Sequence, residues 1–252
     1  MVTTRTPDGT MTIVEHLGEL RRRVIICVVA TAVCAVVVFA LYEPILQFLS
    51  GPYRELTRGD RGCGGTRNEG CDLIVTGPLE PFMVRIRIAG YGGLALAVPI
   101  VAWQIWRFVT PALHRNERRY GLFFGLAAVV LFAAGAVAAW FTIGEALSFL
   151  FGMGGSSLQP FVTADRYLTL VALMLLAFGV AFEFPLLVLA LLLTRVVTTQ
   201  QLRRARRWVV VGITVFAAVI TPSQDPVSLL FMAVPMYVLY EVAIVIGRMA
   251  KR

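Results

Sequence analysis

The chain has 252 residues, of which 58% are hydrophobic, and a mean hydropathy of +0.78. This composition excludes a soluble globular domain, because several apolar stretches approach the ~20 residues that cross a ~30 Å hydrocarbon core. The formal net charge is +8, but its placement along the chain indicates topology and contact with anionic lipid rather than a nucleic-acid-binding stripe.

Six apolar segments predict an all-α polytopic membrane protein with six transmembrane helices, organised as a single integral membrane domain over residues 1–252. The predicted spans cover residues 24–42, 88–106, 121–143, 167–193, 208–220 and 228–247. Three arginines precede the first span, as in a signal peptide, but the stretch lies far from residue 1 and lacks a small-x-small cleavage site. We therefore expect a retained first span.

The fifth span is short, because its 13 apolar residues form only about 20 Å of helix. Three explanations stay open at this stage. The arginines before it can extend their side chains to the interface, the bilayer can thin, or the fifth and sixth segments can form a hairpin that does not cross fully.

The charged residues predict the orientation of the six spans. Of the 23 lysines and arginines, sixteen fall on the side of both termini and seven on the opposite side. Because short cytoplasmic loops carry the excess of positive charge, both termini are expected in the cytoplasm.

Two capping boxes are predicted at helix starts on the cytoplasmic side. Thr12 and Glu15 stand before the first span, and Thr198 and Gln201 stand before the fifth. Each pair satisfies two backbone N–H groups that the first helical turn leaves without partners.

Two cytoplasmic glutamates, Glu19 and Glu117, are not needed for these capping boxes. Glu19 can pair with Arg22 or Arg23 on the next helical turn, and Glu117 falls in the first turn of a helix, where the helix dipole favours an acid. These structural roles are sufficient by themselves. The alternative is that the two carboxylates hold a cationic ligand, since a guanidinium binds a carboxylate through two parallel hydrogen bonds.

The four cysteines fall into two pairs. Cys63 and Cys71 lie in the long polar loop after the first span, on the side expected to be oxidising, and we predict a disulfide between them. The alternative is two free thiols. Cys27 and Cys34 lie inside the first span and are expected to be inert small hydrophobes.

Glu183 lies within an otherwise apolar stretch, residues 172–192, two residues before Pro185. A carboxylate at mid-membrane carries a penalty of ~2.5–3.5 kcal/mol on insertion scales, less where the site is wet, so a neutral acid in a wetted or thinned cavity is expected. Pro185 cannot donate to the carbonyl four residues earlier, which predicts a kink. Two interpretations stay open: an internal hydrogen bond that fixes packing, or a polar contact with a partner helix.

Other polar and proline residues at the span ends are interpreted as structural. Glu80 and Pro81 are expected to cap the entry to the second span. Asp225 is expected at the tip between the fifth and sixth spans with Pro222 and Pro226, where a tight turn explains the prolines. Glu241 is expected to reach the interface or to pair with Arg248, seven residues on.

No motif for reaction chemistry is visible. There is no Gly-x-Ser-x-Gly elbow, no phosphate-binding glycine motif and no His-Glu-x-x-His pattern, and the chain has only two histidines. We therefore expect a protein that is not an enzyme and that uses neither a cofactor nor a metal.

Six stretches, in this order, resemble the TatC family, the multi-span receptor subunit of the twin-arginine protein translocase. They are "HLGELRRR" at 16–23, "PLEPF" at 78–82, "FVTPALHRNERR" at 108–119, "FGVAFEFP" at 178–185, "TPSQDPVS" at 221–228 and "VPMYVLYE" at 234–241. Together they cover nearly the whole chain, one at each connection or membrane entry. Tyr240 belongs to the last of them.

The resemblance implies six spans in a cupped-hand arrangement in a prokaryotic cytoplasmic membrane, with both termini in the cytoplasm. It implies that Glu19 and Glu117 bind the paired arginines of a cargo signal peptide, with Leu20, Arg21 and Phe108 shaping the site. It also implies that Glu183 faces the concave side of the hand. The implied partners are twin-arginine signal peptides of folded precursors, TatA- and TatB-type single-span subunits, further copies of the chain and membrane lipid, with export driven by the protonmotive force and no role for nucleic acid.

Two other functions share the same topology. A proton-coupled secondary transporter would use Glu183 as its relay, although such transporters build a midplane site from several helices. A purely structural membrane anchor would tolerate substitution of Glu19 and Glu117.

Overall fold

The computed structural model describes residues 13–57, 73–109, 121–153, 162–193, 197–223 and 225–249. Its helices are α1 (Ile13–Ala40), α2 (Tyr42–Leu56), α3 (Glu80–Val109), α4 (Gly121–Met153), α5 (Ala164–Phe182), α6 (Phe184–Leu193), α7 (Thr199–Ile220) and α8 (Pro226–Met249). Glu117, the predicted Cys63–Cys71 disulfide and the capping box at Thr12 lie outside the described residues.

Five helical stretches in the described ranges are long and apolar enough to cross a membrane: Leu17–Ala40, Glu80–Ile105, Phe124–Met153, Ala164–Leu192 and Pro226–Met249. The fifth predicted span is the C-terminal part of α7, a helix of 22 residues whose first half carries four arginines. The predicted capping box begins α7: Thr198 and Gln201 exchange hydrogen bonds between side chain and backbone.

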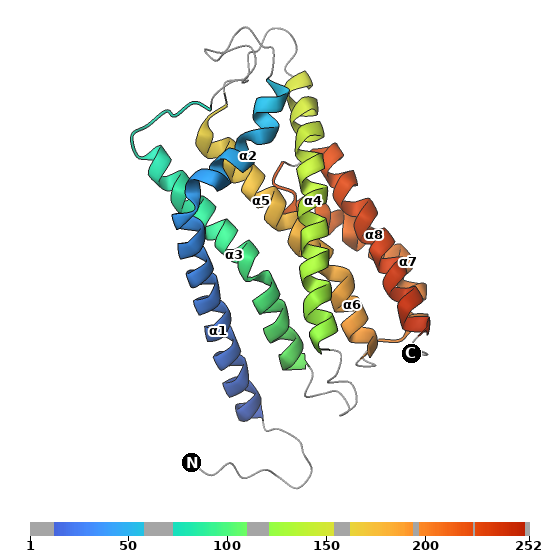
Figure 1. Cartoon of the computed structure of the whole chain (residues 1–252). Coiled ribbons are helices and arrows are strands. Elements are labelled where there is room, and N and C mark those ends of the chain that lie inside the picture. Colours follow the sequence, from blue (N-terminus) through green and yellow to red (C-terminus); the bar gives the residue numbers. More distant parts are fainter. Residues whose placement is uncertain are drawn as a thin grey trace, which may run out of the picture.

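The helices form an up-and-down bundle (Figure 1). The N-terminal end of α1, the C-terminal end of α3 and the C-terminal end of α8 lie together at what we call the lower end. Helix α2 and the beginnings of α3, α5 and α8 lie at the opposite, upper end. Helix α4 extends to Met153, ten residues beyond its predicted span, which places the exposed Glu145 toward the upper end.

Glycines allow two pairs of helices to approach closely. A Cβ at Gly93 of α3 would lie 2.5 Å from the Ala35 Cα of α1, and a Cβ at Gly135 of α4 would lie 2.5 Å from the Phe178 carbonyl oxygen of α5. The partner at Gly135 is backbone, which cannot rotate away. These contacts fix the α1–α3 and α4–α5 packing, as small residues do in membrane helix pairs generally.

Helix α2 was not predicted, although Ile45, Leu49 and Tyr53 recur at helical spacing and pack on the core of the bundle. Pro52 interrupts its hydrogen bonds. The buried Tyr167 hydroxyl of α5 inserts at this point, donating to the Leu49 carbonyl at 3.0 Å and accepting from the Tyr53 N–H at 3.1 Å. Because these two groups would otherwise pair with each other in a regular helix, one side chain both repairs α2 and attaches it to α5.

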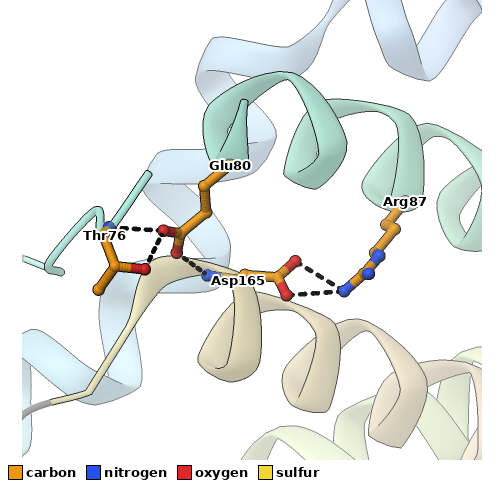
Figure 2. A network of polar contacts seen from close by, with 4 residues as sticks. All are labelled: Thr76, Glu80, Arg87 and Asp165. Atoms are coloured by element: carbon orange, nitrogen blue, oxygen red, sulfur yellow. Dashed lines mark hydrogen bonds and ion pairs between the residues drawn. The ribbon is translucent and has the colours of Figure 1, made fainter. Parts of the chain in front are cut away.

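A polar network joins α3 to α5 at the upper end (Figure 2). Glu80 accepts hydrogen bonds from the Thr76 backbone and hydroxyl at 2.6 and 2.8 Å, and its second oxygen accepts from the Asp165 N–H at 3.1 Å. Arg87 in turn binds both oxygens of the Asp165 side chain at 2.7 and 2.8 Å. Glu80 therefore closes the turn before α3, as a cap would, and also bonds to the first turn of α5.

Asp225 lies at the connection between α7 and α8 and closes it. Its carboxylate accepts from the Ser228 N–H at 2.7 Å, which makes Asp225 the N-cap of α8, with Pro226 at the first helical position. Burial alone would raise the pKa of Asp225, but the polar groups around the carboxylate, among them the Ser228 N–H, outweigh burial and hold that pKa below its usual value.

Of the two alternatives predicted for Glu241, the pair with Arg248 is wrong. Glu241 pairs with Arg206 of α7 at 2.6 Å and accepts from the Tyr237 hydroxyl at 3.1 Å. Arg248 lies about 10 Å further along the helix axis, whereas Arg206 lies beside Glu241 because α7 and α8 pack together. Tyr240 adds a second link, donating to the Leu202 carbonyl at 2.9 Å.

Candidate functional site

Glu19 lies on α1 at the lower end and is already paired. Its Oε1 binds the Arg23 guanidinium one turn further along, so the predicted ion pair is confirmed. Arg23 also donates to the Gln104 carbonyl of α3 at 3.3 Å. The Glu19 side chain is 25% exposed and that of Arg23 is 12% exposed, so this pair is partly shielded from solvent. The other carboxylate oxygen, Oε2, is buried and receives no hydrogen bond from the described residues.

The α1–α3 packing also determines which part of α3 lies level with Glu19. The two helices run in opposite directions (Figure 1) and are in contact from the Gly93–Ala35 approach down to the Arg23–Gln104 bond. One turn toward the lower end on each helix leads from Arg23 to Glu19 and from Gln104 to Phe108. The register therefore brings Glu19 and Phe108 to the same level, as the motifs implied.

The other predicted site residues differ from Glu19 in their exposure and in whether the structure describes them. Leu20 and Arg21 directly follow Glu19 on α1, and both are exposed. Phe108 is half-buried near the C-terminal end of α3. Glu117 belongs to the connection between Val109 and Gly121, outside the described residues, so its distance from Glu19 stays untested.

Glu183 divides the predicted fourth span. Helix α5 ends at Phe182 and α6 begins at Phe184, so the break predicted from Pro185 is confirmed. The Glu183 N–H turns back to the Val180 carbonyl at 3.1 Å, a three-residue step instead of the four of a regular helix. The missing donor at Pro185 is the physical cause, because no N–H reaches the Ala181 carbonyl from the next turn.

An apolar pocket of about 550 Å³ lies among α2, α3, α4 and α5. Phe48, Trp140, Phe141, Phe132 and Leu176 are among the residues that line it. Glu183 is seven residues after Leu176, which places it on the same helical face, about two turns toward the lower end.

The Glu183 side chain is half-buried, and its Oε1 is buried without a hydrogen bond to any described residue. The internal hydrogen bond considered from the sequence is therefore not formed by this oxygen. A buried polar atom without a partner is unfavourable by about 1–3 kcal/mol, so this position favours a donor or acceptor that comes from outside the chain.

Sequence reasoning missed three residues that organise these sites. Arg23 was named only as one of two possible partners of Glu19, and Gln104 and Tyr167 were not considered. For Gln104 and Tyr167 the only available signal was the residue type, a polar group in an apolar stretch, and their partners come from distant parts of the chain. Across the described ranges, no three His, Cys, Asp or Glu side chains gather where they could hold a metal ion.

Long apolar helices and a basic lower end define a multi-pass α-helical membrane protein. The family model for the Sec-independent protein translocase protein (TatC) matches residues 15–235. The chain belongs to this family, so the resemblance found from the motifs is confirmed.

The similar proteins agree with this assignment. The chain is 43% identical over 241 residues to the Sec-independent protein translocase protein TatC of Frankia casuarinae, covering 95% of this chain and 66% of that protein. It is 39% identical to that of Corynebacterium kroppenstedtii, covering 98% of this chain and 64% of that protein. The chain thus spans slightly less than two thirds of these two relatives.

A crystal structure of the twin-arginine translocase receptor TatC superposes with a TM-score of 0.77 at 32% identity, covering 94% of this chain and 100% of that one. The predicted all-α polytopic fold is confirmed by this agreement.

Proposed function

We propose that this protein is the receptor and core subunit of a twin-arginine translocase. It binds the paired-arginine signal peptide of a folded precursor at the lower end and assembles with TatA- and TatB-type single-span subunits, copies of itself and lipid. It performs no reaction of its own, and export is driven by the protonmotive force. The observation that carries this proposal is Glu19, a carboxylate held at the α1–α3 junction, level with Phe108, whose second oxygen is buried and has no donor among the described residues.

The described charges support the proposed orientation. Nine arginines lie toward the lower end: Arg21, Arg22, Arg23, Arg107, Arg203, Arg204, Arg206, Arg207 and Arg248. Four lie toward the upper end: Arg54, Arg85, Arg87 and Arg166. This bias favours a cytoplasmic lower end, which is where a receptor meets cargo that has not yet been exported.

Two glutamates suit the ligand because two arginines need two acceptors. A guanidinium matches a carboxylate through two parallel N–H donors, whereas a lysine ammonium is a compact point charge that is more strongly hydrated. Glu19 and Glu117 together would therefore distinguish Arg-Arg from Lys-Lys.

Peptide binding to the purified protein in nanodiscs tests this role. We expect the twin-arginine peptide to bind the wild type and a Lys-Lys peptide to bind far more weakly. Glu19→Ala and Glu117→Ala are each expected to weaken binding about tenfold or more, since a hydrogen bond to a charged group contributes about 1.5–3 kcal/mol. Glu55→Ala, which removes an exposed glutamate at the upper end, is the matched control and should bind as the wild type does. Equal affinity for both peptides, or full binding by the double Glu19→Ala, Glu117→Ala variant, would overturn the proposal.

Glu183 is proposed to contact a polar group on a partner helix within the membrane. We expect Glu183→Ala to reduce export and crosslinking to the single-span subunits, because alanine has no polar group that a partner helix could contact. Glu183→Gln, which keeps an acceptor and adds donors, is expected to retain more function. The control is Glu145→Ala on α4. Normal export and crosslinking by Glu183→Ala would remove Glu183 from the interface, and proton uptake linked to solute movement would favour the transporter instead.

A further inference from the structure

Arg23 makes contacts that differ from those of the arginines beside it. Its guanidinium joins α1 to α3, with one terminal nitrogen on Glu19 Oε1 and the other on the Gln104 carbonyl. The side chain is only 12% exposed. Arg21 and Arg22, by contrast, are exposed. The geometry therefore separates one partly buried arginine from two exposed ones.

We propose that Arg23 is a positioning residue for signal-peptide binding: it holds the Glu19 carboxylate through Oε1 and leaves Oε2 to accept the guanidinium of a ligand arginine. This inference rests on the proposed function and names the residue that prepares its binding site.

The hydrogen-bonding capacity of Glu19 permits this division of roles. An ionised carboxylate has two oxygens and about four acceptor positions, of which Arg23 uses one. Oε2 is buried and receives no hydrogen bond from the described residues, which is unfavourable until a further donor reaches it. A carboxylate fixed in one rotamer loses less freedom when a ligand binds than one that swings freely, so fixing Glu19 in advance improves affinity.

The alternative, in which Arg23 blocks Glu19 and must leave before a ligand binds, is disfavoured by the Gln104 bond and by burial. A displaced Arg23 would give up both the carboxylate and the α3 carbonyl while keeping its charge, because a guanidinium does not deprotonate in proteins. Lysine is a poor substitute, since its single ammonium lacks the planar fork that reaches both acceptors in a fixed geometry.

The test measures the affinity of a twin-arginine signal peptide for the full chain in nanodiscs. The variants are Arg23→Gln, Arg23→Lys, Glu19→Gln and the double Arg23→Gln, Glu19→Gln variant. Arg22→Gln is the matched control, because it removes the same charge from the adjacent exposed position. Thermal stability of each variant is recorded in the same nanodiscs, and Arg23→Lys provides the measurement if Arg23→Gln does not fold.

We expect Arg23→Gln to weaken binding about five- to tenfold and Arg23→Lys about threefold, less than the loss of a direct charge-assisted hydrogen bond to the ligand would cause, because Arg23 acts through Glu19. Arg22→Gln should change binding less than twofold. On the Glu19→Gln background, Arg23→Gln should cause almost no further loss, because the two residues act through one carboxylate. A purely structural Arg23 would instead lower stability and affinity equally on both backgrounds.

Three results would overturn the inference: tighter binding by Arg23→Gln, unchanged binding, or a full additional loss on the Glu19→Gln background. Its failure is separable from that of the receptor role. If the wild type prefers Arg-Arg and Glu19→Gln weakens binding while Arg23→Gln does not, only the positioning role fails. If the wild type does not distinguish Arg-Arg from Lys-Lys, the receptor role itself fails.

Discussion

Replacing Gly135 with alanine is expected to push α4 away from α5 and to lower the apparent melting temperature of the purified protein markedly. The added Cβ would lie 2.5 Å from the Phe178 carbonyl oxygen and 2.9 Å from the Gly179 Cα. Because both neighbours are backbone, no rotamer change relieves the overlap and the helices themselves must separate. Overpacking of this kind destabilises by about 1–3 kcal/mol. Gly135→Leu should prevent accumulation of folded protein.

Gly144→Ala provides the matched control on the same helix. A Cβ there meets nothing within 4 Å, and alanine is favoured over glycine in a helix by about 1 kcal/mol. This variant should therefore melt at the wild-type temperature or slightly above it. Thermal unfolding followed by size-exclusion chromatography in detergent distinguishes the two. Equal melting of Gly135→Ala and wild type would show that the α4–α5 contact is looser than described.

Tyr167→Phe is expected to destabilise the upper end of the bundle with little change in volume. The hydroxyl bonds to both the Leu49 carbonyl and the Tyr53 N–H, and the Tyr167 side chain is buried, with 1% of the residue exposed. Removing it takes one hydrogen bond from each of two buried backbone groups, which destabilises by about 1–3 kcal/mol per group. Water cannot easily replace the hydroxyl, because the substituted ring would still fill the site.

The consequence should be local to α2. Hydrogen exchange of the α2 amides, above all that of Tyr53, should accelerate in Tyr167→Phe, while the α7 and α8 amides exchange as in the wild type. Tyr91→Phe is the control, since no hydrogen bond of the Tyr91 hydroxyl is formed with the described residues. Unchanged exchange in α2 would mean that the hydroxyl bridge does not hold this helix.

Much of the architecture was predictable because the bilayer imposes it locally. Apolar stretches of about 20 residues identified the helices, Thr198 and Gln201 identified the start of α7, and Pro185 identified the break at Glu183. Each of these signals acts within one or two helical turns, so neighbouring residues in the sequence are sufficient to specify it. Helix α2 was missed because it is too short and too polar to resemble a span, and its proline is repaired only by a residue of α5.

The partners of the charged residues could be predicted only in part from the sequence. By itself the sequence determined that Glu19 and Glu117 were not needed for capping boxes, and that the basic residues divide unevenly between the two sides. Only the tertiary structure decided that Glu241 pairs with Arg206 rather than Arg248, and that Arg23 connects Glu19 to α3. The reason is physical: side chains within a helix meet at fixed offsets of three or four residues, whereas the register between two helices follows from how closely their backbones approach, as at Gly93 and Gly135. The sequence therefore determined the helices and the candidate carboxylates, and packing between helices decided which partners those carboxylates have.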